Sequence, residues 1–180
     1  MTLLLTVLYL ALPAFVANMM PVFAARLGIL GSFNTPIDGG REWRGKRLLG
    51  DNKTWRGVVA AVVGAAATAA AQYFVGVSLP LETVVYSSLG TALIYGAYVG
   101  VLAMLGDAIG SVIKRQLGFA SGAPCIPLDQ LDYILAFIAG TFIFTHWTLA
   151  AVGVLVFFTF FANLLANALG YVIGIKNTYW

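Results

Sequence analysis

The chain has 180 residues, of which 61% are hydrophobic and only 9% are charged, and its mean hydropathy is +0.91. A soluble domain carries about 25% charged residues, so this composition excludes an ordinary soluble protein and indicates an integral membrane protein of one domain. The single cysteine, Cys125, excludes an internal disulfide and lacks the CxxC or Cys/His spacing that would support a zinc site.

Long uncharged runs predict the fold class, which is an all-α bundle of five transmembrane helices formed by residues 1–180. The expected spans lie at about 2–25, 57–79, 83–106, 128–146 and 149–173, and the third continues as a helix to about 117 beyond the membrane. The last two share one uncharged run, which we divide at the polar and aromatic residues 145–148. Residues 26–56 and 107–127 then form two loops on the same side.

The basic residues predict the orientation of the bundle. Of the ten Lys and Arg residues, seven lie in the first of these loops and two in the second, and Lys176 follows the last span. The positive-inside rule makes this side cytoplasmic, with the N-terminus outside, the C-terminus inside and only Glu82 left for the outer face. We therefore expect a multi-pass protein of the cell membrane whose active site faces the cytoplasm.

The first span contains Pro13, Asn18 and Pro21. Prolines kink a membrane helix and free backbone carbonyls, which neighbouring helices or polar side chains must then satisfy. We interpret Asn18 first as a hydrogen-bonding contact between helices, with a substrate groove along the bent helix as the alternative. Asn163 and Asn167 in the fifth span are also predicted to bond neighbouring helices.

A glycine-rich polar segment, GDNKTWRG at 50–57, leads into the second span. It contributes Asn52, Lys53, Thr54, Trp55 and Arg56. Backbone amides and two cations at a helix N-terminus suit phosphate groups, although the Walker pattern GxxxxGK[ST] cannot be matched here. A basic loop beside a membrane is otherwise a topology signal or a contact with anionic lipids, an explanation that suffices for residues 41–47 alone.

The end of the third helix carries a polar stripe. Asp107, Gly110, Ser111 and Lys114 are spaced at i, i+3, i+4 and i+7, so a carboxylate, a hydroxyl and a cation face the same place. Arg115 lies beside them. This spacing predicts one polar site at the membrane surface.

Two further acids open the fourth helix. Pro127 suits the first helical position, which puts Asp129 and Asp132 on one face of the first turn and a half. Together with Asp107 they offer oxygen ligands with few imidazoles, which suits Mg²⁺ bound by carboxylates and substrate phosphates. The alternatives are a helix cap, structural salt bridges with the basic pair of the third helix, and a proton relay.

These residues resemble the signature of the membrane CTP:phosphatidate cytidylyltransferase family. The matching positions, in order, are Gly106, Asp107, Ser111, Lys114, Arg115, Pro127, Leu128, Asp129 and Asp132. Gly110, residues 122–125 and Gln130 depart from the bacterial pattern. With the short chain and the KTWRG box at 53–57, these departures make the resemblance one to the archaeal branch of the family, whose members make CDP-archaeol.

The resemblance implies transfer of the cytidylyl group of CTP to unsaturated archaetidic acid, 2,3-bis-O-geranylgeranylglycerol 1-phosphate, which gives CDP-archaeol and pyrophosphate in archaeal phospholipid biosynthesis. It also implies that Asp107, Asp129 and Asp132 hold Mg²⁺ and act in catalysis with Lys114 and Arg115. The implied nucleotide- and phosphate-binding residues are Asn52, Lys53, Thr54, Trp55, Arg56 and Ser111, with Trp55 a candidate for stacking on cytosine. The expected partners are CTP and an isoprenoid glycerol phosphate lipid, with no nucleic acid.

Three alternative functions remain at this point. The same chemistry on a diacyl phosphatidic acid would keep every residue assignment. A CDP-alcohol phosphotransferase is suggested by Asp38, Gly39 and Arg41, but its pattern requires two further aspartates four residues apart, and Asp129 and Asp132 are three apart. A small ion-coupled transporter should show discontinuous spans and polar residues near the bilayer midplane, whereas these charges gather at one surface.

Overall fold

The structure is a computed structural model, and it describes residues 3–75 and 86–174. These residues form five α-helices, namely α1 (Leu3–Arg26), α2 (Trp55–Val75), α3 (Leu89–Gln116), α4 (Leu128–Thr141) and α5 (Leu149–Val172). The prediction of a membrane protein built from five helices is confirmed.

The α1–α2 loop contains short elements that the sequence did not predict. They are a 3₁₀ turn, η1 (Gly31–Phe33), and the antiparallel strands β1 (Glu42–Trp43) and β2 (Lys46–Arg47). The hairpin forms because Arg44 and Gly45, its two turn residues, both have positive φ angles, as a tight two-residue turn requires.

The fourth predicted span is shorter than expected. Helix α4 ends at Thr141 instead of 146, because Trp147 folds back and its Nε1 donates a hydrogen bond of 3.0 Å to Thr141 Oγ1. Its 14 residues extend about 21 Å, which is less than the roughly 30 Å of the hydrocarbon core. Among the described residues, four helices are long and apolar enough to cross a membrane, and these are α1, α2, α3 and α5.

Helix α3 begins later than the predicted span at 83–106. It begins at Leu89 because Ser88 and Thr91 form a capping box, in which each backbone N–H donates to the other residue's hydroxyl. The helix then continues past Asp107 to Gln116. The predicted boundaries at 79 and 83, and the charged residues Glu82 and Lys176, lie outside the described residues.

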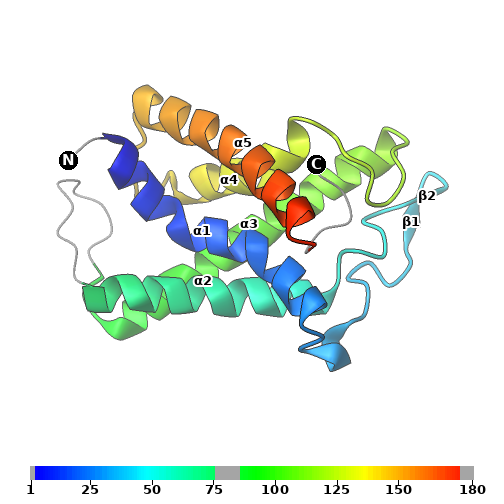
Figure 1. Cartoon of the computed structure of the whole chain (residues 1–180), viewed down its shortest axis with the longest axis horizontal. Helices are drawn as coiled ribbons and strands as arrows, with labels where there is room; N and C mark the ends of the chain where they lie inside the picture. The colour runs from blue at the N-terminus through cyan, green and yellow to red at the C-terminus, as the bar shows by residue number, and fades with distance from the viewer. Residues whose placement is uncertain (1–2, 76–85, 175–180) are drawn as a thin grey trace.

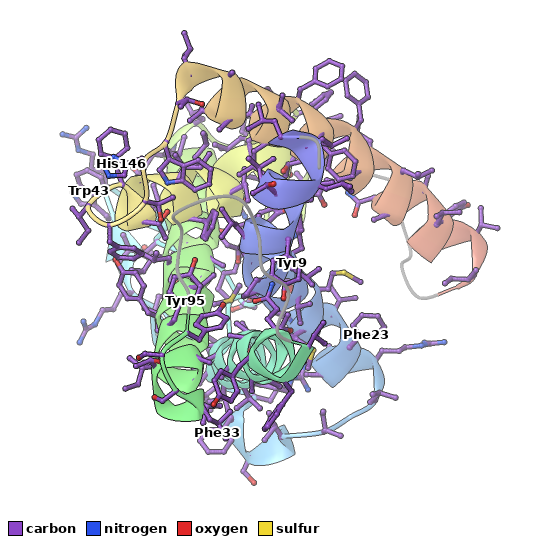
Figure 2. All side chains as sticks on the ribbon, turned by 90° about the vertical axis from the view of Figure 1, so that its left-hand side faces the viewer. Tyr9, Phe23, Phe33, Trp43, Tyr95 and His146 are labelled. Carbon is purple, nitrogen blue, oxygen red and sulfur yellow. The ribbon has the colours of Figure 1, made fainter. Side chains whose placement is uncertain are left out.

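The helices run back and forth along one axis (Figure 1). The α1–α2 loop with its hairpin lies at the end of the bundle away from the N-terminus, and α3 ends on the same side. Helix α1 contacts all four other helices. Viewed from the N-terminal end, it lies among them (Figure 2), and the buried core joins Val7 of α1 to Val99, Phe137 and Leu155 of α3, α4 and α5.

Proline chemistry in α1 determines one contact with α2. Because Pro13 has no N–H, it leaves the carbonyl of Tyr9 without its helical donor, and Gln72 Nε2 on α2 donates to that oxygen at 2.6 Å. The Tyr9 hydroxyl donates in return to the backbone carbonyl of Gln72 at 3.4 Å. The expectation that a neighbouring helix satisfies a carbonyl freed by proline is therefore confirmed, and Figure 2 labels Tyr9 on α1.

Candidate active site

The α1–α2 loop is organised around the buried carboxylate of Asp38, which is 7% exposed. This carboxylate accepts hydrogen bonds from Arg47 Nη2 at 2.9 Å and from the backbone N–H groups of Gly40, Leu49 and Gly50 at 3.0 to 3.2 Å. Burial opposes the charged form, but these donors outweigh it and lower the pKa of Asp38 well below its ordinary value. A charged, fully bonded carboxylate thus fixes the loop up to Gly50.

The next segment holds Lys53 and Thr54 at the start of α2. The backbone N–H of Ile37 donates to the Lys53 carbonyl at 2.9 Å, and that of Trp55 donates to the Thr35 carbonyl at 3.1 Å. Thr54 Oγ1 accepts from the N–H of Gly57 at 3.4 Å and so caps the helix. The loop therefore presents the side chains of this segment from a fixed backbone.

Two lysine–aspartate pairs join the elements around the site. Lys53 Nζ lies 2.6 Å from Asp107 Oδ1, which ties the loop to α3. Lys114 Nζ lies 2.8 and 2.9 Å from the two carboxylate oxygens of Asp129, which ties α3 to α4. Asp129 also accepts from the backbone N–H of Cys125 at 2.8 Å. The polar stripe on α3 thus faces both the first loop and the start of α4.

Asp132 approaches α3 where that helix has a glycine. A Cβ on Gly110 would lie only 2.6 Å from Asp132 Oδ2, so the missing side chain is what lets this carboxylate sit against the helix. Asp132 Oδ1 accepts from the backbone N–H of Tyr133 at 2.7 Å. Pro127 precedes α4 as its N-cap residue, one position before the predicted one, and the helix begins at Leu128.

A cavity of about 820 Å³ lies between these pairs and the helices α1 and α5. Its polar wall includes Asn52, Lys53, Thr54, Arg56, Asp107, Lys114 and Asp129. Its other wall includes Asn18, Pro21 and Val22 of α1 and Asn163 and Asn167 of α5. The position of Asn18 in this lining favours the alternative interpretation, a groove along the first helix, over the interhelical contact that we expected first.

Asn163 has two roles in the structure. Its Nδ2 donates to the Gln130 carbonyl at 3.1 Å and to the Tyr133 hydroxyl at 3.3 Å, as the prediction of a contact between helices requires. It also lines the cavity.

A smaller recess of about 80 Å³ continues from this cavity past Ser111 and Arg115. Most of the predicted site residues line one of these two spaces, but Trp55 and Asp132 line neither. Trp55 is the first residue of α2, and it is half-exposed. The sequence interpretation missed the role of Asp38 in holding the α1–α2 loop, and its signal was a lone acid before a run of glycines and cations.

The carboxylates have the right chemistry for Mg²⁺ but do not form a ready-made three-aspartate cage. Among the described residues, no three His, Cys, Asp or Glu side chains lie close enough together to hold one ion. Asp107 and Asp129 instead face lysines. Magnesium is usually held by one or two protein carboxylates together with substrate phosphates, and this donor set fits that arrangement.

A membrane helix bundle with lysines and carboxylates around a cavity at one end defines a class: membrane-embedded proteins whose charged groups gather at one end of the bundle. The chain belongs to the CDP-archaeol synthase family. The family described as CarS-like, CDP-archaeol synthase, matches residues 1–180, which confirms the resemblance found in the sequence.

Individual relatives agree with this membership. The CDP-archaeol synthase of Thermococcus gammatolerans is 37% identical over 177 residues, covering 96% of this chain and 94% of that protein. The CDP-archaeol synthase of Methanocaldococcus jannaschii is 33% identical, covering 96% and 95%. A solved structure, described as an intramembrane enzyme for archaeal membrane lipids biosynthesis, matches with a TM-score of 0.74 and 28% identity over 91% of this chain and 94% of that one.

Proposed function

We propose that the cavity is where this chain, a CDP-archaeol synthase, transfers the cytidylyl group of CTP to the phosphate of unsaturated archaetidic acid. The observation that carries the proposal is the pair of unlike walls. Cations and carboxylates from the α1–α2 loop, α3 and α4 form one wall, and the membrane helices α1 and α5 form the other. A nucleotide triphosphate requires the charges of the first wall, and a lipid whose chains lie in the membrane can reach the cavity along membrane helices such as those of the second.

The reaction requires charge neutralisation more than acid–base catalysis. An oxygen of the lipid phosphate, already an anion, forms a bond to the α-phosphorus of CTP, while the bond from that phosphorus to the oxygen bridging to the β-phosphorus breaks and pyrophosphate leaves. Lys53, Lys114 and Arg56 line the cavity and are the cations we assign to the phosphates. Asn52 and Thr54 offer neutral polar contacts beside them. Phosphate oxygens then compete with Asp107 and Asp129 for the two lysines.

Mg²⁺ is part of the proposal. When bound, it neutralises phosphate charge that the cations leave uncompensated. Asp107, Asp129 and Asp132 are the residues that we assign to it, and the approach of the Asp132 carboxylate to Gly110 of α3 supports the inclusion of Asp132. The pairing of Asp107 and Asp129 with lysines means that these two carboxylates become free for a metal as the phosphates take the lysines.

We also propose that the site faces the cytoplasm in a multi-pass protein of the cell membrane. The support is the distribution of charge. Every Asp, Glu, Lys and Arg side chain among the described residues lies in the α1–α2 loop, at the adjoining ends of α1 and α2, in the last three turns of α3 or in the first two turns of α4. The positive-inside rule then places this end of the bundle on the cytoplasmic side.

The experiment that tests the function measures CDP-lipid formation and pyrophosphate release by the purified protein in detergent with Mg²⁺ and CTP. The lipid is either the digeranylgeranyl or a diacyl glycerol phosphate. Asp129→Asn removes the partner of Lys114 and a proposed metal ligand, and we expect a loss of at least about 100-fold in kcat/KM. Glu42→Gln makes the same chemical change on the exposed hairpin and should retain full activity.

Each outcome has a definite meaning. Product that requires both CTP and the isoprenoid lipid, and that is lost only in Asp129→Asn, supports the proposal. A preference for the diacyl lipid would keep the chemistry and contradict the lipid assignment. If neither lipid gives product, flux of ions across sealed vesicles without nucleotide would test the transporter alternative.

A further inference from the structure

Arg115, which the family resemblance implies is catalytic, is a buried cation to which the proposed function assigns no phosphate. It is 7% exposed, and no salt bridge forms between it and any other described residue. Its Nε is buried and has no hydrogen-bond partner in the part of the chain that the structure describes. A buried charge without a partner is costly, so a ligand anion is the natural counterpart of this guanidinium.

Arg115 lies where two spaces meet. It lines the small recess beside Asp107, Lys114 and Asp129, and it also lines a separate pocket of about 320 Å³ on the loop side of α3. Ser121 likewise lines both spaces. The recess also shares Lys53 with the main cavity, so it connects that cavity to the outer pocket, and Asp51 lines both of the larger spaces. The volume of the outer pocket is at the lower end of the roughly 300–1,000 Å³ typical of small-ligand sites.

The outer pocket is positively charged. Lys46, Arg47 and Arg115 contribute three cations to its lining, and Asp51 contributes one anion. Arg47 is already bonded to Asp38 and Asp51, with distances of 2.9 Å to each. Lys46 is held at the pocket by a hydrogen bond of 2.7 Å from its Nζ to the Gln116 carbonyl, which leaves its charge without a carboxylate partner among the described residues. An anion in this pocket would therefore meet Lys46 and Arg115 as unneutralised cations.

The direction of the reaction connects this pocket to the chemistry. In phosphoryl and nucleotidyl transfer, the attacking and leaving oxygens lie roughly in line on opposite sides of the phosphorus. If the lipid phosphate approaches from the main cavity between α1 and α5, the leaving group departs on the opposite side, past Lys114 and Arg115. That path leads into the recess and then into the outer pocket.

We propose that the outer pocket lined by Lys46, Arg115 and Ser121 binds the diphosphate that leaves CTP. This inference rests on the proposed function, because it takes the lipid to enter from the other wall. The diphosphate has two possible states in the pocket: the β- and γ-phosphates of bound CTP, or free pyrophosphate after the P–O bond has broken. Both present the same chemistry to the pocket, and the test separates them.

The test uses the full chain in detergent and a charge reversal at the mouth of the pocket, Lys46→Glu. Its matched control is Arg41→Glu, which changes the net charge equally in the same loop at an exposed position that lines none of these spaces. Two quantities are measured in each variant: the pyrophosphate concentration that halves CDP-lipid formation, and the KM for CTP. Titration calorimetry with inorganic pyrophosphate, without CTP or lipid, measures binding directly.

We expect Lys46→Glu to raise the inhibitory pyrophosphate concentration about five- to twentyfold over Arg41→Glu, because an exposed cation becomes an anion beside the ligand. A parallel rise in the KM for CTP means that the pocket already holds the phosphate tail of the substrate. An unchanged KM means that it receives only the product. Equal inhibition constants in the two variants would overturn the inference.

The test distinguishes a failure of this inference from a failure of the proposed function. If CDP-lipid forms normally but pyrophosphate binding does not depend on Lys46, the assignment of the outer pocket is wrong and the transferase assignment stands. Binding that depends on Lys46 in a chain unable to transfer cytidylyl groups from CTP would overturn the leaving-group assignment together with the proposed function.

Discussion

In the proposed function, the lysine–aspartate pairs set the charge that an incoming phosphate meets. Lys53 with Asp107 and Lys114 with Asp129 are each neutral as a pair, and the side chains of Lys53 and Asp107 are both 26% exposed. Net positive charge at the cavity therefore comes from Arg26 and from other residues outside these pairs. A multiply charged phosphate attracts a lysine more strongly than one carboxylate does, so the pairs hold the site open without blocking it.

Adding a single methyl group at Gly110 tests whether the position of the Asp132 carboxylate matters. We expect Gly110→Ala to push the Asp132 carboxylate away from α3, because the new Cβ would lie 2.6 Å from Oδ2. A displacement of this kind at a reacting centre should lower kcat about 10- to 100-fold while the protein stays folded. Steady-state kinetics on the purified enzyme measure the effect.

The matched control is Gly153→Ala on α5, where an added Cβ meets nothing within 4 Å. It should leave kcat within about twofold of the wild-type value and should not lower the melting temperature. Equal kcat in both variants would show that the position of Asp132 does not matter for the reaction.

At the scale of elements, the α1–α2 loop depends on the ionised form of Asp38. Because hydrogen bonding lowers the folded-state pKa of Asp38 below its unfolded value, its charge stabilises the folded loop above about pH 4, the ordinary range for an aspartate. That stability is lost as the pH falls from about 4 toward the lower folded-state pKa. The loop presents Lys53 and Thr54, so the effect should reach the site.

We expect Asp38→Asn to raise the rate of limited proteolysis within 27–54 at pH 7 and to lower the melting temperature. An amide has one acceptor oxygen and an NH2 donor in place of the second carboxylate oxygen, so a buried donor such as the Gly50 N–H loses a partner, at a cost of about 1–3 kcal/mol. The difference from the wild type should shrink as the pH is lowered below 4. A difference that is constant from pH 7 to pH 3 would contradict this account.

The contact between α1 and α2 offers a second prediction at this scale. Gln72→Leu removes the donor that satisfies the Tyr9 carbonyl, and we expect it to destabilise the bundle by about 0.6–1.7 kcal/mol, the range seen for hydrogen bonds between membrane helices. Thermal unfolding in detergent measures the change.

A double-mutant cycle with Pro13→Ala isolates the cause. Alanine restores a backbone N–H for the Tyr9 carbonyl, so Gln72→Leu should cost less in that background than in the wild type. If the two costs are equal, the carbonyl freed by Pro13 is not the reason that Gln72 matters.

For the whole molecule, the central prediction is the side of the membrane on which the site lies. Cys125 is the only cysteine in the chain, is partly exposed and lies in the α3–α4 connection beside Asp129. A membrane-impermeant maleimide should label it in inside-out vesicles but not in right-side-out vesicles.

The control places a thiol at the other end of the bundle. In a Cys125→Ser background, His146→Cys lies between α4 and α5 at an exposed position. It should be labelled only in right-side-out vesicles. Labelling of both positions from the same side would contradict the orientation that the basic residues predict.

Several features followed from the sequence because their physics is local. Hydrophobic runs longer than a membrane core predict helices, and proline in α1 predicts a carbonyl that needs an external donor. The spacing of Asp107, Ser111 and Lys114 predicts a shared face as soon as α3 is helical. Family membership followed from these motifs and was confirmed by the comparisons.

Other features required the positions of distant residues. That Lys53 pairs with Asp107, 54 residues later, depends on how the loop docks on α3. The end of α4 at Thr141 depends on the return of Trp147, and the role of Asp38 depends on four donors brought together by the hairpin. The sequence by itself therefore determined the membrane class, the helices and the residue types of the site. Only the tertiary structure decided which charges are paired and that the buried Arg115 has no ion-pair partner among the described residues, because pairing depends on distances between elements that no local pattern encodes.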